Sequence, residues 1–212
     1  ALGGAGRSLV GVSYSVFLVP GLIMMSIAQN AFANTSSSLV ISKVQGNIVD
    51  VLMPPISAWE LALGFVGAGV TRGLLVGLVV GLAMRLFVPY QILHPVYIVY
   101  HAVMAACMLS LLGMIGGIWA EKFDHIAAVT NFIITPLSFL SGTFYSVDRL
   151  PETWHLIAFL NPFFYMIDGF RYGFIGHADA APLTGVLVML SINLVLAMVT
   201  YRMLASGYRL KS

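Results

Sequence analysis

The residues of this sequence that could carry chemistry are few. His94 and His101 stand seven residues apart on one face of an expected helix, where two histidines could bind haem or a metal, although interfacial or hydrogen-bonded histidines are commoner. Ser110 could be a nucleophile with His101 as its base, but nine residues of helix would separate the two by about 13 Å. No HExxH, GxSxG or CxxC motif occurs. We therefore predict no catalytic residue, no metal ligand and no enzyme activity.

Nucleotide and nucleic-acid binding are equally unsupported. The sequence lacks a GxxxxGK[ST] motif, which would cradle nucleotide phosphates, so we predict no cofactor in this chain; energy from ATP would have to come from a partner. The formal net charge is +2 without a basic run, which gives no indication of a nucleic-acid partner. The single cysteine, Cys107, excludes an intramolecular disulfide.

One pair of opposite charges lies in an unusually aromatic stretch. Asp168 and Arg171 are three residues apart, so they can meet on one helix face. The pair is either a local neutralising ion pair, which is the commoner case, or a gate contact at the mouth of a cavity.

The composition indicates that these residues are positioned by elements inside a lipid bilayer. Of 212 residues, 59% are apolar and only 8% are charged, and the mean hydropathy is +0.95. Soluble domains carry about 25% charged residues, because their surface must face water. We predict an all-α integral membrane protein whose surroundings are mostly lipid.

Five segments are long and apolar enough to cross about 30 Å of hydrocarbon. They cover about residues 14–32, 64–87, 96–118, 127–145 and 183–204. The first is expected to fade into the polar stretch 34–38, and the fourth to kink at Pro136. The second belongs to a helical pattern over 58–87, about 45 Å long, so one end must project. Arg72, in its first half, is expected to snorkel to the headgroups.

Basic residues set the expected orientation. With an inner C-terminus, the inner side carries Lys43, Lys122, Arg202, Arg209 and Lys211. The outer side then carries Arg7, Arg85, Arg149 and Arg171. This small bias favours a cytoplasmic C-terminus. Five spans would then place Ala1 outside, so we expect a sixth span to precede this sequence in the full chain.

The segment 146–182, between the last two spans, is too aromatic for a solvated loop and too short to cross the bilayer twice. Asn161-Pro162 divides it into two helical pieces, over about 151–160 and 163–175. We predict a re-entrant helical hairpin that enters from the outer face. Such backbone is tolerated only beside protein or a water-filled cavity, which indicates a pathway.

Two further patterns leave alternatives open. A glycine recurs every four residues in the second span, at Gly69, Gly73, Gly77 and Gly81. This spacing lets helix backbones approach closely, either within the chain, which we favour, or at a dimer seam. The segment 43–57 is too polar to span and contains Pro54-Pro55; it is either an interfacial helix lying on lipid or a helix that docks on a soluble partner.

Three stretches in order and over essentially the whole chain resemble the ABC-2 type permease family of ABC transporters: 17–25 (FLVPGLIMM), 43–57 and 137–176. The resemblance implies a homodimer of six-span subunits in the bacterial inner membrane, with two copies of a separate cytoplasmic ATPase that binds ATP and magnesium. It also implies that 43–50 is a coupling helix seated in the ATPase. The coupling residues would be Lys43, Gly46, Asp50, Pro54 and Pro55. The outer gate would include Asn161, Pro162, Phe163, Tyr165, Asp168, Arg171 and Tyr172.

The resulting hypothesis is that this chain is the membrane subunit of an exporter that works by alternating access. The segment 43–57 and the hairpin would then be exposed to opposite compartments. One alternative is a secondary transporter without an ATPase, but such proteins place ionisable residues at mid-membrane, and these spans offer almost none. The other is a structural membrane subunit, which would have no need of a hairpin. A lipid-linked, amphiphilic or hydrophobic cargo is compatible with the apolar spans.

Overall fold

The computed structural model describes residues 8, 9, 11–145 and 158–209, and most of them are helical. Five helices are long and apolar enough to cross a membrane, which confirms the all-α membrane fold. They are α1 (Tyr14–Val44), α3 (Ala58–Phe87), α4 (Pro95–Trp119), the α5–η1–α6 helix (Phe123–Leu140) and α9 (Pro182–Ala205). A short antiparallel pair, β1 (Ser8–Leu9) with β2 (Val12–Ser13), precedes α1.

Helix α1 is twelve residues longer than the predicted first span. It does not fade at 34–38 but continues to Val44. The hydroxyl groups of Ser36, Ser37 and Ser38 each donate to a carbonyl four residues earlier, at 2.8, 2.6 and 2.7 Å. Polar side chains that bond their own helix in this way can continue it through an apolar environment.

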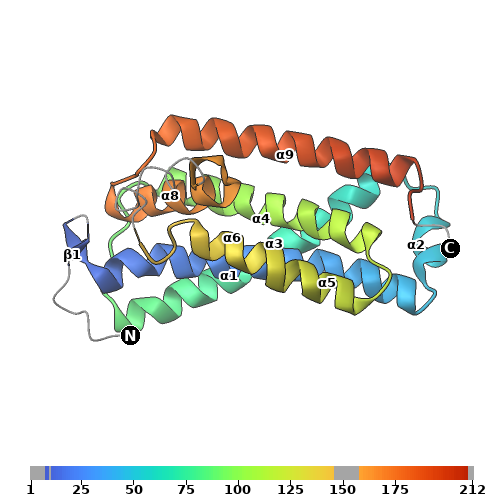
Figure 1. Cartoon of the computed structure of the whole chain (residues 1–212), viewed down its shortest axis with the longest axis horizontal. Coiled ribbons are helices and arrows are strands. Elements are labelled where there is room, and N and C mark those ends of the chain that lie inside the picture. Colours follow the sequence, from blue (N-terminus) through green and yellow to red (C-terminus); the bar gives the residue numbers. More distant parts are fainter. Residues whose placement is uncertain (1–7, 10, 146–157, 210–212) are drawn as a thin grey trace.

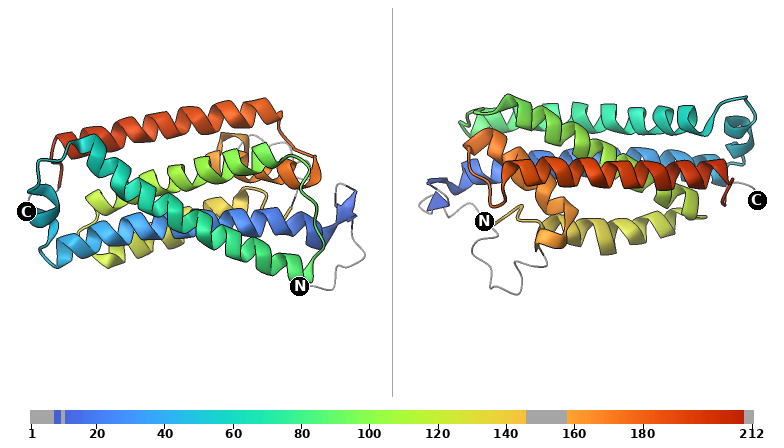
Figure 2. Two further views of the ribbon diagram at one scale, coloured as in Figure 1. Left: turned by 180° about the vertical axis from the view of Figure 1, so that it is seen from behind. Right: turned by 90° about the horizontal axis from the view of Figure 1, so that it is seen from above.

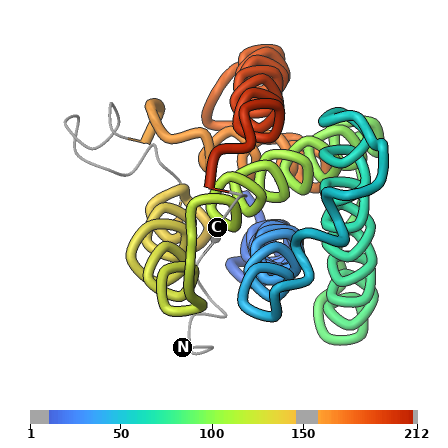
Figure 3. Tube along the Cα trace, turned by 90° about the vertical axis from the view of Figure 1, so that its right-hand side faces the viewer, coloured from blue at the N-terminus to red at the C-terminus, as the bar shows by residue number. Residues whose placement is uncertain are grey.

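Helix α4 is the centre of the bundle. It is apolar all round, as expected for a helix with protein on most sides, and it packs against α1, α3, α8 and α9. The end-on view shows α4 passing between α1 and α9, with α3 on one side of α1 and the α5–α6 helix on the other (Figure 3). One side of α1 is left without a covering helix from the described chain.

The fourth span contains a π-helical turn instead of a simple proline kink. It consists of α5 (Phe123–Val129), the π-helix η1 (Thr130–Ile134) and α6 (Thr135–Leu140). Pro136 has no N–H, and its ring crowds the carbonyl four residues earlier, at Phe132. The wider π turn relieves this crowding one turn before the proline. The helix ends at Leu140, five residues earlier than predicted.

The two short helices lie at opposite ends of the bundle (Figure 1). Helix α2 (Ile48–Leu52) follows α1 at one end, which we call the loop end. Helix α8 (Pro162–Ile175) lies at the other, the α8 end. The first predicted hairpin piece, 151–160, lies mostly outside the described residues, whereas the second corresponds to α8. The views in Figure 2 show that the long helices run between these two ends.

Candidate functional site

The loop end exposes a short apolar and acidic connection between α1 and α3. Gly46 adopts a φ of +77°, a left-handed conformation that suits glycine and turns the chain between α1 and α2. The prediction of one coupling helix over 43–50 is therefore wrong, because this turn divides it. Asp50 lies in α2 and is exposed, and Pro54-Pro55 follow in an exposed bend. Five apolar side chains here are also exposed: Val44, Val49, Leu52, Met53 and Ile56.

Lys43 has a different position from the rest of this connection. It lies in the last turn of α1, and its ammonium group donates to the carbonyls of Ile118 and Ala120 at the end of α4. These bonds join the loop-end termini of the two most extensively packed helices. A displacement of the α1–α2 turn would therefore be transmitted directly to α4.

Basic and aromatic side chains gather at the loop end. Trp59 and Tyr201 stack with ring centroids 4.9 Å apart, and they join the start of α3 to the end of α9. Arg209 donates to the Trp119 carbonyl at 3.1 Å and lies 3.8 Å from the Glu121 carboxylate. This is the belt of amphipathic side chains expected where a bundle meets the headgroup layer.

Helix α8 is buried on nearly all sides by α1, α4 and α9. Asn161 caps it: the Asn161 side-chain oxygen accepts the Phe163 N–H at 3.0 Å. The Asn161 amide also donates to the Leu137 carbonyl and the Ser141 hydroxyl, at 3.2 and 2.9 Å. Asn161 thus fixes the start of α8 to the end of the α5–α6 helix, a role that its place before a proline did not reveal.

Arg171, further along α8, also holds this helix to the chain at the end of the α5–α6 helix. Its side chain is 2% exposed, and one guanidinium N–H donates to the Gly142 carbonyl at 2.6 Å. The guanidinium also lies over the Phe17 ring, 3.9 Å from the centroid, which is a favourable cation–π geometry. Arg171 therefore joins α8, the turn after α6 and α1.

Asp168 is bonded to the chain that leads into α9. Its buried carboxylate accepts the backbone N–H groups of Asp179 and Ala180 at 2.9 and 3.0 Å. No ion pair joins Asp168 to Arg171 in the part of the chain that the structure describes. The predicted direct pair is wrong, because each side chain bonds backbone groups of a different neighbouring segment.

The pH dependence of stability should report on Asp168, which lies outside the five spans. Burial raises the pKa of its carboxyl to about 6, against the opposing effect of its two N–H bonds. The folded state therefore holds this proton more tightly than the unfolded chain, whose ordinary pKa is 3.8, so the associated stability is lost as pH rises through 6. The difference corresponds to about 3 kcal/mol. We expect the melting temperature to fall between about pH 4 and 6 and to level off above that range, and Asp168→Asn to remove that slope; an unchanged slope in the variant would contradict this.

The two histidines considered as ligands have separate environments. His94 stacks on Tyr172 with centroids 4.7 Å apart, at the start of α4. His101 is fully buried about two turns further along α4, and its Nδ1 bonds the Tyr97 carbonyl at 2.9 Å. A Cβ atom on Gly169 would lie 2.1 Å from His101 Nε2, so this glycine is what lets α8 approach α4. Among the described residues, no group of three metal-ligating side chains occurs.

The glycine stripe of α3 lies against α1 of the same chain. A Cβ atom on Gly69 would lie 2.5 Å from Thr35 Oγ1, and one on Gly73 would lie 3.0 Å from the Ile27 carbonyl oxygen. Gly77 meets the Ile27 side chain in the same way, and Gly81 faces Ile23. The close approach that the spacing predicted is thus an intramolecular one in this arrangement.

A polar strip follows the uncovered side of α1. It is half-buried and comprises Ser26, Gln29, Asn30, Asn34, Ser37 and Ser38. Arg72 of α3 lies beside it: its Nη1 donates to Asn34 Oδ1 at 3.4 Å. The structure thus gives Arg72 a contact with α1 that the sequence did not predict. The recurrence of polar residues every four positions, at 26, 30, 34 and 38, was the signal in the sequence that could have revealed this strip.

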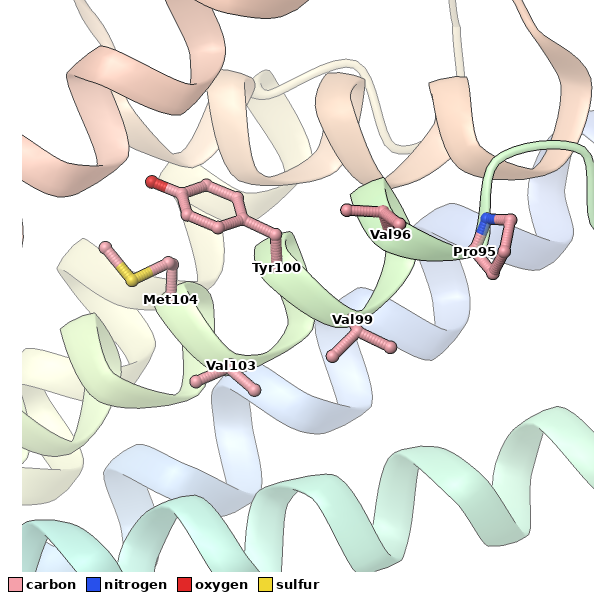
Figure 4. Close-up of a pocket in the computed structure, with 6 residues that line it drawn as sticks. All are labelled: Pro95, Val96, Val99, Tyr100, Val103 and Met104. Carbon is pink, nitrogen blue, oxygen red and sulfur yellow. The ribbon is translucent and has the colours of Figure 1, made fainter.

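The opposite side of the bundle is apolar. A hollow of about 560 Å³ on α4 is lined by Pro95, Val96, Val99, Tyr100, Val103 and Met104 (Figure 4). Its one hydroxyl group, on Tyr100, already donates to the Val186 carbonyl at 2.8 Å. This surface suits lipid chains and offers nothing to a polar cargo.

These features define a multi-pass membrane protein with an exposed connection at one end and a short buried helix at the other. A family model described as ABC-2 type transporter matches residues 4–175, and the chain belongs to this family. The chain is 45% identical over 181 residues to "Inner membrane transport permease YadH" of Escherichia coli (strain K12), which covers 84% of this chain and 71% of that protein. It is 26% identical over 172 residues to "Nodulation protein J" of Rhizobium leguminosarum bv. viciae, covering 80% and 66%.

The resemblance found in the sequence is thereby confirmed. The chain is a transport permease and a multi-pass protein of the bacterial inner membrane. ABC-2 permeases are membrane components that work, in general, with an ABC ATPase.

Proposed function

We propose that this chain is the membrane-spanning subunit of an ATP-driven exporter, and that it works as a homodimer with two copies of a separate ATPase. ATP and its magnesium ion would be bound by those partner subunits. The observation that carries the proposal is the division of the molecule into two unlike ends, with an exposed connection at the loop end and a buried helix at the α8 end. Four basic residues lie at the loop end and support the placement of this end on the cytoplasmic side: Lys43, Lys122, Arg202 and Arg209.

The connection between α1 and α3 is the proposed docking element for the ATPase. It combines exposed apolar side chains with the Asp50 carboxylate, and nothing lies within 4 Å of a Cβ atom built on Gly46. An ATPase that binds this connection differently in its ATP-bound and ATP-free states would shift the permease between two states. The bonds from Lys43 to the end of α4 provide the mechanical link.

The uncovered side of α1 is the proposed dimer and pathway face. Amides, hydroxyls and a guanidinium cannot face hydrocarbon without a large free-energy cost, so protein or water must cover the polar strip. A second copy related by a two-fold axis along the membrane normal would cover it and enclose a polar route.

The α8 end is the proposed outer gate. Asn161 and Arg171 fix α8 to the end of the α5–α6 helix, and Asp168 fixes it to the start of α9. Movement of any of these helices would therefore move α8, past which cargo would leave. A purely structural subunit would not need a helix held in this way.

A secondary transporter remains the alternative, but Arg72, the charged residue half-way along α3, does not supply what such a protein needs. Proton coupling needs a group that gains and loses a proton, whereas the guanidinium of Arg72 stays charged at all physiological pH values.

Cross-linking tests the proposal. In a Cys107→Ala background, Asp50→Cys should cross-link to the co-expressed ATPase subunit and be labelled from the cytoplasm. Asp124→Cys, an exposed carboxylate of α5 at the same end, is the matched control and should be labelled without forming the cross-link. Gly176→Cys, at the end of α8, should be labelled only from the periplasm. Labelling of positions 50 and 176 from the same side, or no cross-link at position 50, would contradict the proposal.

A further inference from the structure

Arg72 lies half-way along the spanning helix α3. It is thirteen residues from Trp59, which stacks on Tyr201 at the loop end, and thirteen from Arg85, which lies over the Tyr90 ring at the other end. Each interval corresponds to about 20 Å of helix. Their combined length is close to the thickness of a bilayer with its headgroups, which is about 40–45 Å. Arg72 is therefore too deep for its side chain to reach either headgroup layer.

No carboxylate of the described chain lies at this depth. The six described carboxylates belong to residues at the two ends of the bundle: Asp50, Glu60, Glu121 and Asp124 at the loop end, and Asp168 and Asp179 at the α8 end. A two-fold axis along the membrane normal keeps every residue at its own depth. The described carboxylates of a second copy would therefore be equally far from Arg72.

Most hydrogen-bond donors of the Arg72 guanidinium have no acceptor among the described residues. The long contact to Asn34 is the single hydrogen bond of the guanidinium to a described residue, although this group has five N–H donors. The hydroxyls of Ser26 and Ser38 and the amide of Asn30 donate to carbonyls of their own helix. The described strip thus presents neutral side chains to a fixed positive charge and holds no counter-charge.

We propose that Arg72 and the polar strip of α1 bind an anionic group of the transported molecule, a phosphate or a carboxylate, at mid-membrane. The planar guanidinium matches either group in a bidentate geometry. An anion supplied by the cargo removes the cost of an unpaired charge in this environment. The inference rests on the proposed transport role and assigns the cargo to anionic amphiphiles.

Binding to the full chain in phosphatidylcholine nanodiscs tests this without the ATPase. The probes are dodecyl phosphate, dodecanoate and the neutral dodecyl maltoside, which share one alkyl chain, and the readout is the shift in melting temperature during titration. Wild type should bind at least one anionic probe about tenfold or more tightly than the maltoside. The tighter of the two anionic probes identifies the anion. Arg72→Gln should lose this preference, and Arg72→Lys should retain part of it.

Arg85→Gln is the matched control, because Arg85 is the other exposed arginine of α3 and lies at the helix end. It should leave the preference unchanged. The proposal is overturned if wild type does not distinguish the anionic probes from the maltoside, if Arg72→Gln binds them as wild type does, or if Arg85→Gln is equally impaired. Should Arg72→Gln fail to insert, loss of the preference in Arg72→Lys would likewise overturn it. A negative result here together with a cross-link at position 50 would leave the exporter proposal standing.

Discussion

Gly46→Trp and Asp50→Lys are expected to abolish coupled ATP hydrolysis by the complex while leaving the chain in the membrane. Both residues are exposed in the connection between α1 and α3, and neither supports the packing of the five spans. Lysine at position 50 reverses a charge at the proposed docking surface, and like charges across an interface cost several kcal/mol, or about a hundredfold or more in affinity. The measurement is permease-dependent ATP hydrolysis in proteoliposomes, with membrane insertion followed in parallel.

Matched variants separate docking from folding. Gly46→Asn keeps a residue that tolerates the left-handed conformation and adds only a small side chain, so it should retain most activity. Asp124→Lys reverses an exposed charge on the same side of the membrane but outside the connection, and it should be silent. If Asp50→Lys hydrolyses ATP at the wild-type rate, the docking role of this connection is wrong.

Gly113→Leu should have the largest effect on stability. A Cβ atom at this position of α4 would lie 2.6 Å from the carbonyl oxygen of Phe32 and 3.2 Å from its Cα, so the obstacle is the backbone of α1. Backbone cannot rotate away as a side chain can, so the cost should lie near the upper end of the about 1–3 kcal/mol that is typical of overpacking. We expect loss of the monodisperse peak in size-exclusion chromatography after mild heating.

Two glycines of α3 provide the comparison. At Gly67 nothing lies within 4 Å of an added Cβ atom, so Gly67→Leu should melt as wild type does. At Gly77 the nearest atoms belong to the flexible side chain of Ile27, so Gly77→Leu should be intermediate. Equal melting temperatures for the variants at positions 67 and 113 would show that α1 and α4 do not approach as closely as these distances indicate.

The spans could be predicted because each is a local property of the sequence. The long pattern over 58–87 and the last span correspond closely to α3 and α9, and Asn161-Pro162 marks the start of α8 because a proline favours the first turn of a helix. The end of α1 could not be predicted from polarity, since Ser36, Ser37 and Ser38 satisfy their hydroxyl groups within the helix.

The site residues likewise include features that the sequence could predict and features that it could not. The spacing of Asp168 and Arg171 allowed a contact between them, but their hydrogen bonds go to Gly142 and to the segment before α9, which only the packing of α8 brings close. The role of Lys43 was likewise hidden, because its acceptors lie about 75 residues away in the sequence, at the end of α4.

By itself, the sequence determined the lipid surroundings, the five spans found among the described residues and the family, because each depends on composition, helical length or an ordered set of motifs. The tertiary structure decided which helix the glycine stripe contacts, which side of α1 stays uncovered, and that Arg72 lies beside Asn34 far from any described carboxylate. The physical reason is that helical periodicity fixes which residues share a face, whereas the neighbour of that face is chosen by the packing of segments distant in the sequence.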